Sequence, residues 1–304
     1  MLKGFRIVFI LLLVFGFSGV RIGDTSEIAQ YFPATPESYW VYEDQDGNEL
    51  TRRAIEGERI GGMEYLAFEY EPTLENSVDY DYHIHPGLYQ VNEEGVTFWV
   101  GDEARKALQA RLAKEMDAFL KTAKQMGPPD QDIEVYYDVE AEIQDAFYML
   151  AVPIAFNEKW DATQINAKIT MKVDPPQEPG DVAFNFTITE RGKVIGTENV
   201  ETPAGTFQNC LKIEYRTYTQ VLITPPEVGE DTNPSGETVT TLWVAPNVGI
   251  VKSHQKAEDI FLKIVPLPGI VTSTTVKTLQ LKKYEIKSAD TEEDKNNLSD
   301  GTHD

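Results

Sequence analysis

Short runs in which apolar and polar residues alternate occur along most of the chain. In residues 183–190, for example, Phe184, Phe186 and Ile188 alternate with polar neighbours. Because successive side chains of a β-strand point to opposite faces, such a run places its apolar residues on one face of a sheet. Turn-forming residues separate the runs at short intervals, which is typical of antiparallel strands joined by tight turns. The pattern predicts a mainly β fold, built as a curved antiparallel sheet or an open barrel-like meander.

The expected strands cover most of the chain. Hairpin turns are predicted at Asp46-Gly47, Gly61-Gly62 and Arg191-Gly192-Lys193. Residues 132–155 fit either a strand or a second short helix, and the proline-rich residues 174–180 form a loop that could divide two lobes. Strands are expected from residue 160 onward as far as the proline-rich loop, and residues 207–223 form one long strand or two. The other strands are expected at residues 39–42, 51–55, 65–70, 78–85, 87–92, 96–100, 183–190, 194–200, 238–244, 250–256 and 272–286.

One segment near residues 102–126 has the period of an amphipathic helix. Asp102 suits the N-cap position, and Gly127 followed by two prolines ends the pattern. A basic opposite face indicates a solvated surface, with a partner-docking helix or a lid as the alternative. The apolar positions are Leu108, Leu112, Met116, Phe119, Ala123 and Met126, and the basic ones are Arg105, Lys106, Arg111, Lys114, Lys121 and Lys124.

Both ends of the chain differ from this β-rich region, which extends over residues 25–286 as one domain with the helix inserted. Lys3 and Arg6 precede an apolar run, and small residues follow it, which is the order of a secretory signal peptide over residues 1–20. The run is short for a transmembrane helix, and no other segment resembles one. Residues 287–304 are polar and acidic, so we expect a disordered tail. The sequence therefore predicts a periplasmic or extracellular protein, which stays anchored if the signal is uncleaved.

The chain is strongly acidic, with 50 acidic residues against 27 basic ones and a formal net charge of −23. Nucleic acid binding requires clustered Lys and Arg, so this balance argues against it. Solubility outside the cytoplasm explains the acidity most simply, and attraction of cations or basic partners is the alternative. The single cysteine, Cys210, cannot form an internal disulfide and is expected to be a small buried apolar side chain.

Four local motifs resemble those of the DUF3108-like (TapB-like) family of uncharacterised exported bacterial β proteins. The resemblance spans roughly residues 31–286, with the helix as an apparent insertion. It implies an exported β fold and no established reaction or catalytic residue. The motifs are Tyr31-Phe32-Pro33 with Trp40 and Tyr42; Val152-Pro153 with Trp160, where Phe156-Asn157 replace an expected Val-Gly; Thr202-Pro203-Ala204-Gly205-Thr206-Phe207 with Cys210-Leu211-Lys212-Ile213; and Trp243-Val244-Ala245-Pro246-Asn247-Val248-Gly249-Ile250-Val251-Lys252.

The strongest candidate site for chemistry is a pair of histidines with nearby acids. If residues 78–85 form a strand, its period of two places Asp79, Asp81, His83 and His85 on one face. Imidazole and carboxylate groups can bind zinc or a similar ion. The simpler interpretation is a solvent-facing side of an edge strand. No nucleophile elbow, phosphate-binding loop or HExxH pair occurs.

These observations favour an exported, non-catalytic binding or structural protein that needs no cofactor. Its partner is expected to be an unknown apolar small molecule or a protein, held in the concavity of the sheet. The alternative is a metal-dependent hydrolase that uses His83 and His85.

Overall fold

The computed structural model describes residues 28–73, 83–84, 87–126, 134–174, 180–224, 235–258, 260 and 274–288. In this part of the chain, 13 strands form one open antiparallel sheet, and a long helix, α2 (Asp102–Met126), is inserted between two of them. The mainly β prediction is confirmed. The strands are β1 (Tyr39–Asp44), β2 (Glu49–Ile60), β3 (Met63–Glu71), β4 (Leu88–Asn92), β5 (Gly95–Trp99), β6 (Glu134–Ile143), β7 (Ala146–Ala151), β8 (Lys159–Asp174), β9 (Val182–Thr202), β10 (Gly205–Thr224), β11 (Ser235–Ala245), β12 (Gly249–Glu258) and β13 (Thr274–Glu285).

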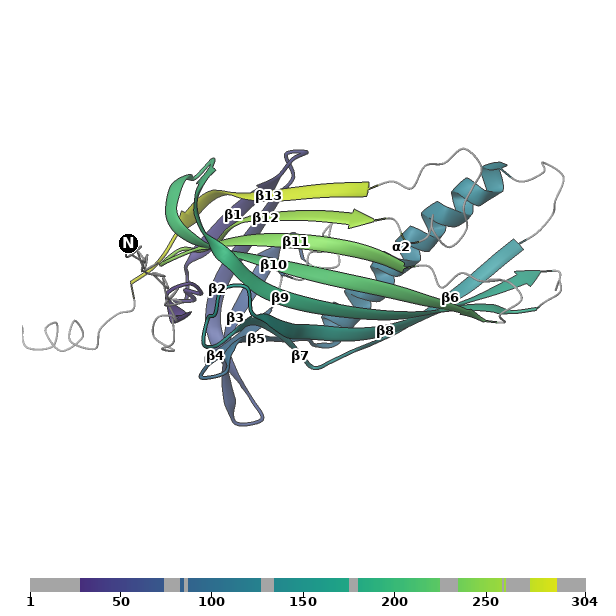
Figure 1. Cartoon of the computed structure of the whole chain (residues 1–304), viewed down its shortest axis with the longest axis horizontal. Coiled ribbons are helices and arrows are strands. Elements are labelled where there is room, and N and C mark those ends of the chain that lie inside the picture. The colour runs from purple at the N-terminus through teal and green to yellow at the C-terminus, as the bar shows by residue number, and fades with distance from the viewer. Residues whose placement is uncertain are drawn as a thin grey trace, which may run out of the picture.

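The sheet is strongly curved. Its strand order is β6-β8-β9-β10-β11-β12-β13-β1-β2-β3-β4-β5-β7, so the first strand, β1, pairs with the last, β13. Figure 1 shows β8 to β13 running side by side along the molecule, with β2 to β5 gathered towards one end. The edge strand β7 comes back against β8, where Trp160 Nε1 donates a hydrogen bond to the Tyr148 carbonyl oxygen at 2.8 Å. The sheet therefore has a concave side, which we call the inner face.

One region differs from the sequence prediction, and the structure decides between two alternatives in another. The turn predicted at Arg191-Gly192-Lys193 is wrong, because β9 runs through these residues without a break. A Cβ atom at Gly192 would lie 2.3 Å from the Trp160 ring, so only a glycine lets the indole approach the strand this closely. Residues 132–155, which fitted a strand or a helix, contain the strands β6 and β7.

Residues of the first and fourth motifs meet at the hairpin between β11 and β12. Trp40 Nε1 donates to the Val248 carbonyl oxygen at 2.6 Å, and the Tyr42 hydroxyl donates to the Ile250 carbonyl oxygen at 3.0 Å. Both acceptors belong to the hairpin between β11 and β12. Asn157, which replaces an expected glycine, has a φ of 66°, a conformation that asparagine tolerates better than most residues. These motifs therefore join distant segments of the fold.

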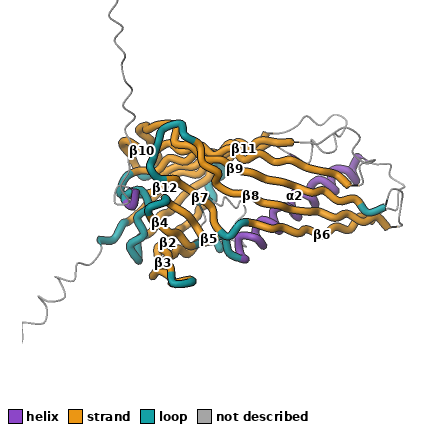
Figure 2. Tube along the Cα trace, turned by 60° about the horizontal axis from the view of Figure 1, so that its bottom comes forward, coloured by secondary structure: helices purple, strands orange, loops and turns teal. Residues whose placement is uncertain are grey.

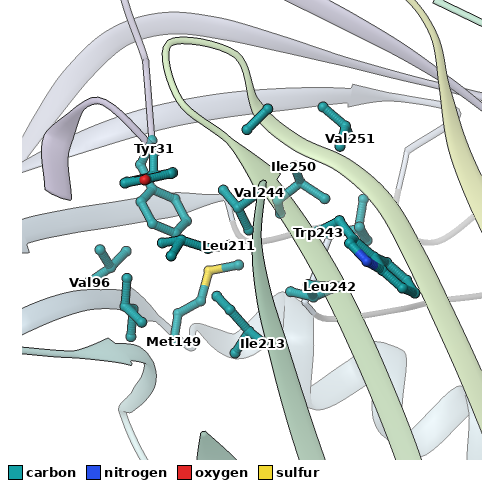
Figure 3. Close-up of a cluster of buried hydrophobic side chains, with 14 of the residues drawn as sticks. Tyr31, Val96, Met149, Leu211, Ile213, Leu242, Trp243, Val244, Ile250 and Val251 are labelled. Carbon is teal, nitrogen blue, oxygen red and sulfur yellow. The ribbon is translucent and has the colours of Figure 1, made fainter. Parts of the chain in front are cut away.

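Two separate apolar clusters lie on the sheet. The larger, which we call the main core, gathers side chains such as Met149, Leu211, Ile213 and Leu242, seen in close-up in Figure 3. Cys210 belongs to it, as predicted, and burial raises the pKa of its thiol to about 11. The smaller cluster, the second core, consists of Leu112, Met116, Ala141, Ala167, Ile169, Val182, Phe184, Phe186, Val221 and Ile223.

Helix α2 packs over the second core. Figure 2 shows the helix running obliquely across β8 and β6, at the end of the sheet away from β2 to β5. The Tyr137 hydroxyl of β6 donates to the Ala113 carbonyl oxygen at 3.0 Å, and Gln109 Nε2 donates to the Val139 carbonyl oxygen at 3.3 Å. Leu112 and Met116 point into the cluster. The predicted helix is confirmed, and four residues of its predicted apolar face, Leu108, Leu112, Met116 and Phe119, pack in or against this cluster.

Several predictions fall outside the described residues. The signal segment at residues 1–20 and the tail beyond residue 288 are among them. Most of the strand expected at residues 78–85 also lies outside the described residues. Residues 83–84, which are described, form a turn. Within the described part, no helix is long and apolar enough to cross a membrane.

Candidate functional site

A row of polar side chains crosses the inner face between the two cores. Thr163 on β8 is paired in register with Glu190 on β9, and Glu190 with Thr217 on β10. One step towards the main core, Thr240 on β11 pairs with Gln255 on β12. We call these five residues the polar belt. Four of them are buried, so the belt is part of the interior and divides it into two apolar regions.

His83 completes the belt from the segment between β3 and β4. Its Nε2 lies 3.0 Å from Glu190 Oε1, and both side chains are almost completely buried. The hydroxyl of Thr217 donates to the other carboxylate oxygen of Glu190. The imidazole also packs against Tyr215, with ring centroids 4.5 Å apart, and edge-on against Phe147 at 5.5 Å. A buried carboxylate needs such partners, because transfer of an unpaired charge from water is very unfavourable.

The position of Glu190 in its strand already indicates that its side chain is buried. Phe184, Phe186 and Ile188 point to the inner face, and Glu190 continues the same period of two. A carboxylate at an inward position of an apolar strand predicts a buried polar partner. The identity of that partner, His83, depends on a contact across 107 residues, which no local pattern encodes.

The predicted metal ligands are only partly placed by the structure. His83 is buried rather than on a solvent-facing strand, and its Nε2 faces Glu190 from a distant strand. Asp79, Asp81 and His85 lie outside the described residues. Within the described part, no three His, Cys, Asp or Glu side chains come close enough together to hold a metal ion. The metal site at these four residues stays a prediction.

Beyond the polar belt, the inner face is apolar and covered by α2. Phe184, Phe186, Val221 and Ile223 face the helix from β9 and β10. The helix itself has two buried side chains in this cluster, of which Met116 is fully buried. At about 1.5–3 kcal/mol for each buried apolar side chain, these two contribute about 3–6 kcal/mol before the cost of ordering the helix. Leu108, Phe119 and Leu120 of the helix are partly buried against the same cluster, so five apolar side chains hold α2 on the inner face.

A buried arginine lies in a second polar environment, inside the main core. Arg52 on β2 is 3% exposed, and its guanidinium carbon is 3.7 Å from the centroid of the Phe68 ring. The centroids of the Trp40 and Tyr89 rings are each 5.0 Å from the same carbon. We call these three rings the aromatic cage. The sequence indicates this burial in the same way as for Glu190. Arg52 alternates along β2 with Leu50 and Ala54, so all three side chains lie on the same face of the strand.

The aromatic cage only partly compensates the buried charge. A cation over an aromatic ring gains about 0.5–2 kcal/mol, whereas desolvating an ammonium-sized ion in a protein costs several kcal/mol. Burial acts to lower the pKa of Arg52, but the neighbouring tyrosines, Tyr89 foremost, outweigh it and the pKa is raised. Arg52 is therefore a cation in this environment.

The protein is thus a single curved antiparallel sheet with one inserted helix, and a polar belt divides its interior into two apolar cores. The sequence matches the model of the DUF3108-like family over residues 106–259, half of the chain, and the protein belongs to this family. The matched span is narrower than the resemblance inferred from the motifs and includes most of α2. No curated protein matches the chain.

Three solved structures are similar at low identity. One is a predicted lipoprotein of Parabacteroides distasonis, with 14% identity, a TM-score of 0.35 and coverage of 84% of this chain and 98% of that one. Another is a predicted exported protein of Bacteroides fragilis with a YmcC-like fold, with 15% identity, a TM-score of 0.34 and coverage of 84% and 98%. The third is the hypothetical lipoprotein YmcC of Escherichia coli, with 11% identity, a TM-score of 0.25 and coverage of 88% and 91%. These scores are too low to bear on the site.

Proposed function

We propose that this protein is an exported, non-catalytic binding protein that takes an apolar ligand or an apolar stretch of polypeptide on the inner face, at the position that α2 covers. The observation that carries the proposal is the division of the interior. The second core is separate from the main core and depends on α2 for its cover. An apolar surface that one helix covers and uncovers is a common form of ligand site.

The main core is a poor place for such a ligand. Its side chains fill the space, since Tyr42, Ile213 and Leu242 are all completely buried. The second core is different, because moving one helix would expose Phe184, Phe186 and their neighbours together. In this interpretation α2 is a lid, and the ligand takes over its apolar contacts.

A matched pair of substitutions on α2 tests the lid. Met116→Glu places a carboxylate at a fully buried position, whereas Ala118→Glu makes a similar change at an exposed position of the same helix. A carboxylate is unfavourable in an apolar cluster, so the first variant should release α2 from the inner face. We expect the sheet to stay folded and to bind N-phenyl-1-naphthylamine more strongly than the wild type does. Ala118→Glu should behave like the wild type.

The opposite outcome would reject the lid. If Met116→Glu unfolds the whole protein, α2 is an inseparable part of one core. If the sheet survives and the probe does not bind, the uncovered face is not a binding surface. Mass spectrometry of molecules that co-purify with the wild-type protein then separates an apolar small molecule from a polypeptide.

Export is the second component of the proposal. Residues 1–20 contain two basic residues, then an apolar run and then small residues, which is the order of a secretory signal peptide and supports export. Sequencing the N-terminus of the mature protein from the exported fraction tests it. A mature N-terminus near residue 20 is expected, and retention of the intact chain in the cytoplasm would contradict it.

The alternative of a metal-dependent hydrolase has one supporting observation, the approach of a distant carboxylate, Glu190, to His83. It requires metal in the purified protein. Elemental analysis of the wild type and of the His83→Ala, His85→Ala double variant tests this directly. Stoichiometric metal that the double variant loses would favour the hydrolase, and a wild type without stoichiometric metal would end that hypothesis.

A further inference from the structure

One hydroxyl group of the polar belt is left without a hydrogen bond. Thr163 is 7% exposed, and its Oγ1 has no hydrogen-bond partner in the described part of the chain. Its register partner on β9 is Glu190, whose carboxylate faces His83 Nε2 and accepts a hydrogen bond from the Thr217 hydroxyl. Buried polar groups are nearly always satisfied, so a further polar group is expected beside Thr163. A water molecule or the polar part of a ligand would satisfy it.

The belt lies at one end of the apolar surface that α2 covers. On β8, the inward face continues from Thr163 to Ala167 and Ile169 of the second core, and on β9 it continues from Glu190 back to Phe186. At about 3.3 Å per residue, Ile169 lies roughly 20 Å along β8 from Thr163. A long apolar strip that ends in polar groups matches an amphiphile, which has an apolar chain and a polar head group.

A head group at the belt needs no space in the main core. Thr217 and Thr219 of β10 are half-buried, and so is Ile188 of β9, which packs against the second core. Glu190 is paired in register with Thr217, and Ile188 with Thr219. The inner face therefore remains partly accessible to solvent beside the belt, at the border of the surface that α2 covers.

The chemistry of the belt favours a head group that donates hydrogen bonds. An ionised carboxylate and a hydroxyl oxygen both accept hydrogen bonds, whereas an ammonium group only donates them. Directly opposed side chains of neighbouring strands have Cβ atoms about 4.5–5.5 Å apart, so one head group can contact both Thr163 and Glu190. A carboxylate head group would bring a second negative charge close to Glu190, which is unfavourable where the dielectric constant is low.

We propose that the ligand of the inner face is a long-chain amine whose ammonium group donates hydrogen bonds to the Glu190 carboxylate and to Thr163 Oγ1. Its apolar chain takes the place of α2 on the second core, so this inference rests on the proposed function. The net charge of −23 acts in the same direction, because it attracts cations and repels anions.

Three probes with the same chain length test the head group: dodecylamine, dodecanol and dodecanoate. Each is titrated into the wild-type protein in a calorimeter, below the concentration at which it forms micelles. Met116→Glu is not used here, because it adds a carboxylate to the site. At an effective dielectric constant of about 20, a charge about 5 Å from Glu190 should make dodecylamine bind at least a hundred-fold more tightly than dodecanoate. Dodecanol should lie between them.

Two acids of β9 separate a local charge from the net charge. Glu190→Gln and Glu201→Gln change the net charge equally, but Glu190 is buried in the belt and Glu201 is exposed. Only Glu190→Gln should lower the preference for dodecylamine over dodecanoate, by about ten-fold or more. Equal changes in the two variants would mean that the ligand responds to net charge alone, and would overturn the proposal.

Two threonines test the unsatisfied hydroxyl. Thr163→Val removes it with little change of shape, and Thr189→Val makes the same substitution at an exposed position of β9. Loss of one hydrogen bond to a charged group should weaken dodecylamine binding by about ten-fold in Thr163→Val, with no change in Thr189→Val. If Thr163→Val binds dodecylamine as tightly as the wild type does, water satisfies Thr163 and the proposal is wrong.

The failure of this inference differs from the failure of the proposed function. If the wild type binds dodecanoate as tightly as dodecylamine, the ammonium assignment falls and the apolar binding face stands. If none of the three probes binds, the inference falls, and N-phenyl-1-naphthylamine binding by Met116→Glu decides the proposed function separately.

Discussion

Replacing Glu190 by leucine should destabilise the protein far more than replacing an exposed acid would. The change removes the carboxylate that His83 Nε2 faces at 3.0 Å and the acceptor of the Thr217 hydroxyl. Removing the acceptor of a buried hydrogen bond costs about 1–3 kcal/mol, because the donor that is left behind keeps its desolvation penalty. We therefore expect the free energy of unfolding, measured in urea, to fall by about that amount.

The same geometry predicts that a second substitution repairs much of the loss. His83→Phe keeps a ring between Tyr215 and Phe147, and with Glu190→Leu it turns the pair into apolar contacts. The double variant should lose much less than the sum of the single losses, with a coupling energy of about 1–3 kcal/mol. His254→Phe is the control, because His254 contacts Thr278 and not Glu190. Its effect should add to that of Glu190→Leu. If His83→Phe and Glu190→Leu are also additive, the two side chains do not interact in solution and the reasoning is refuted.

Two further outcomes follow from single contacts. Gly192→Ala should cost about 1–3 kcal/mol, because its Cβ would meet the Trp160 ring, whereas Gly87→Ala, with open space, should change the unfolding midpoint little; equal effects would contradict the close packing. Partial burial acts to raise the pKa of Asp44, but hydrogen bonds, those from Asn48 first, lower it below its ordinary value. This carboxylate therefore stabilises the fold above its unfolded pKa and less as pH falls through the folded pKa. Asp44→Asn should lose about 1 kcal/mol at pH 7 in urea unfolding and nothing at acidic pH, and a loss that persists at acidic pH would contradict the assignment.

The sequence predicted the strands because burial on one face leaves a local trace. Residues 183–190 showed their inward face through Phe184 and Phe186, and the helix showed its own through Leu112 and Met116. The same reasoning failed at Gly192, where a glycine between two basic residues resembles a turn. The reason for that glycine is a tryptophan on the neighbouring strand, and a local pattern contains no information about it.

The site was less predictable, because its contacts join residues that are distant in sequence. His83 was identified as a candidate from its neighbours, and the structure pairs it with Glu190 instead. Arg52 was not identified at all, although it lies at an inward position of an alternating strand. Glu190 and Arg52 both occupy positions of an alternating strand where an apolar residue is expected, and this departure from the pattern indicates a buried polar group. Such positions mark buried polar groups in advance, although their partners emerge only from the topology.

Hydrogen exchange of the backbone amides tests the central claim most directly. Peptides from α2 should exchange through a local opening whose free energy is well below that of global unfolding and changes little with urea. Peptides from β9 and β10 near the main core should exchange only when the whole sheet unfolds. If α2 and these strands exchange with the same free energy and the same dependence on urea, the helix does not open by itself and the binding face beneath it is never uncovered.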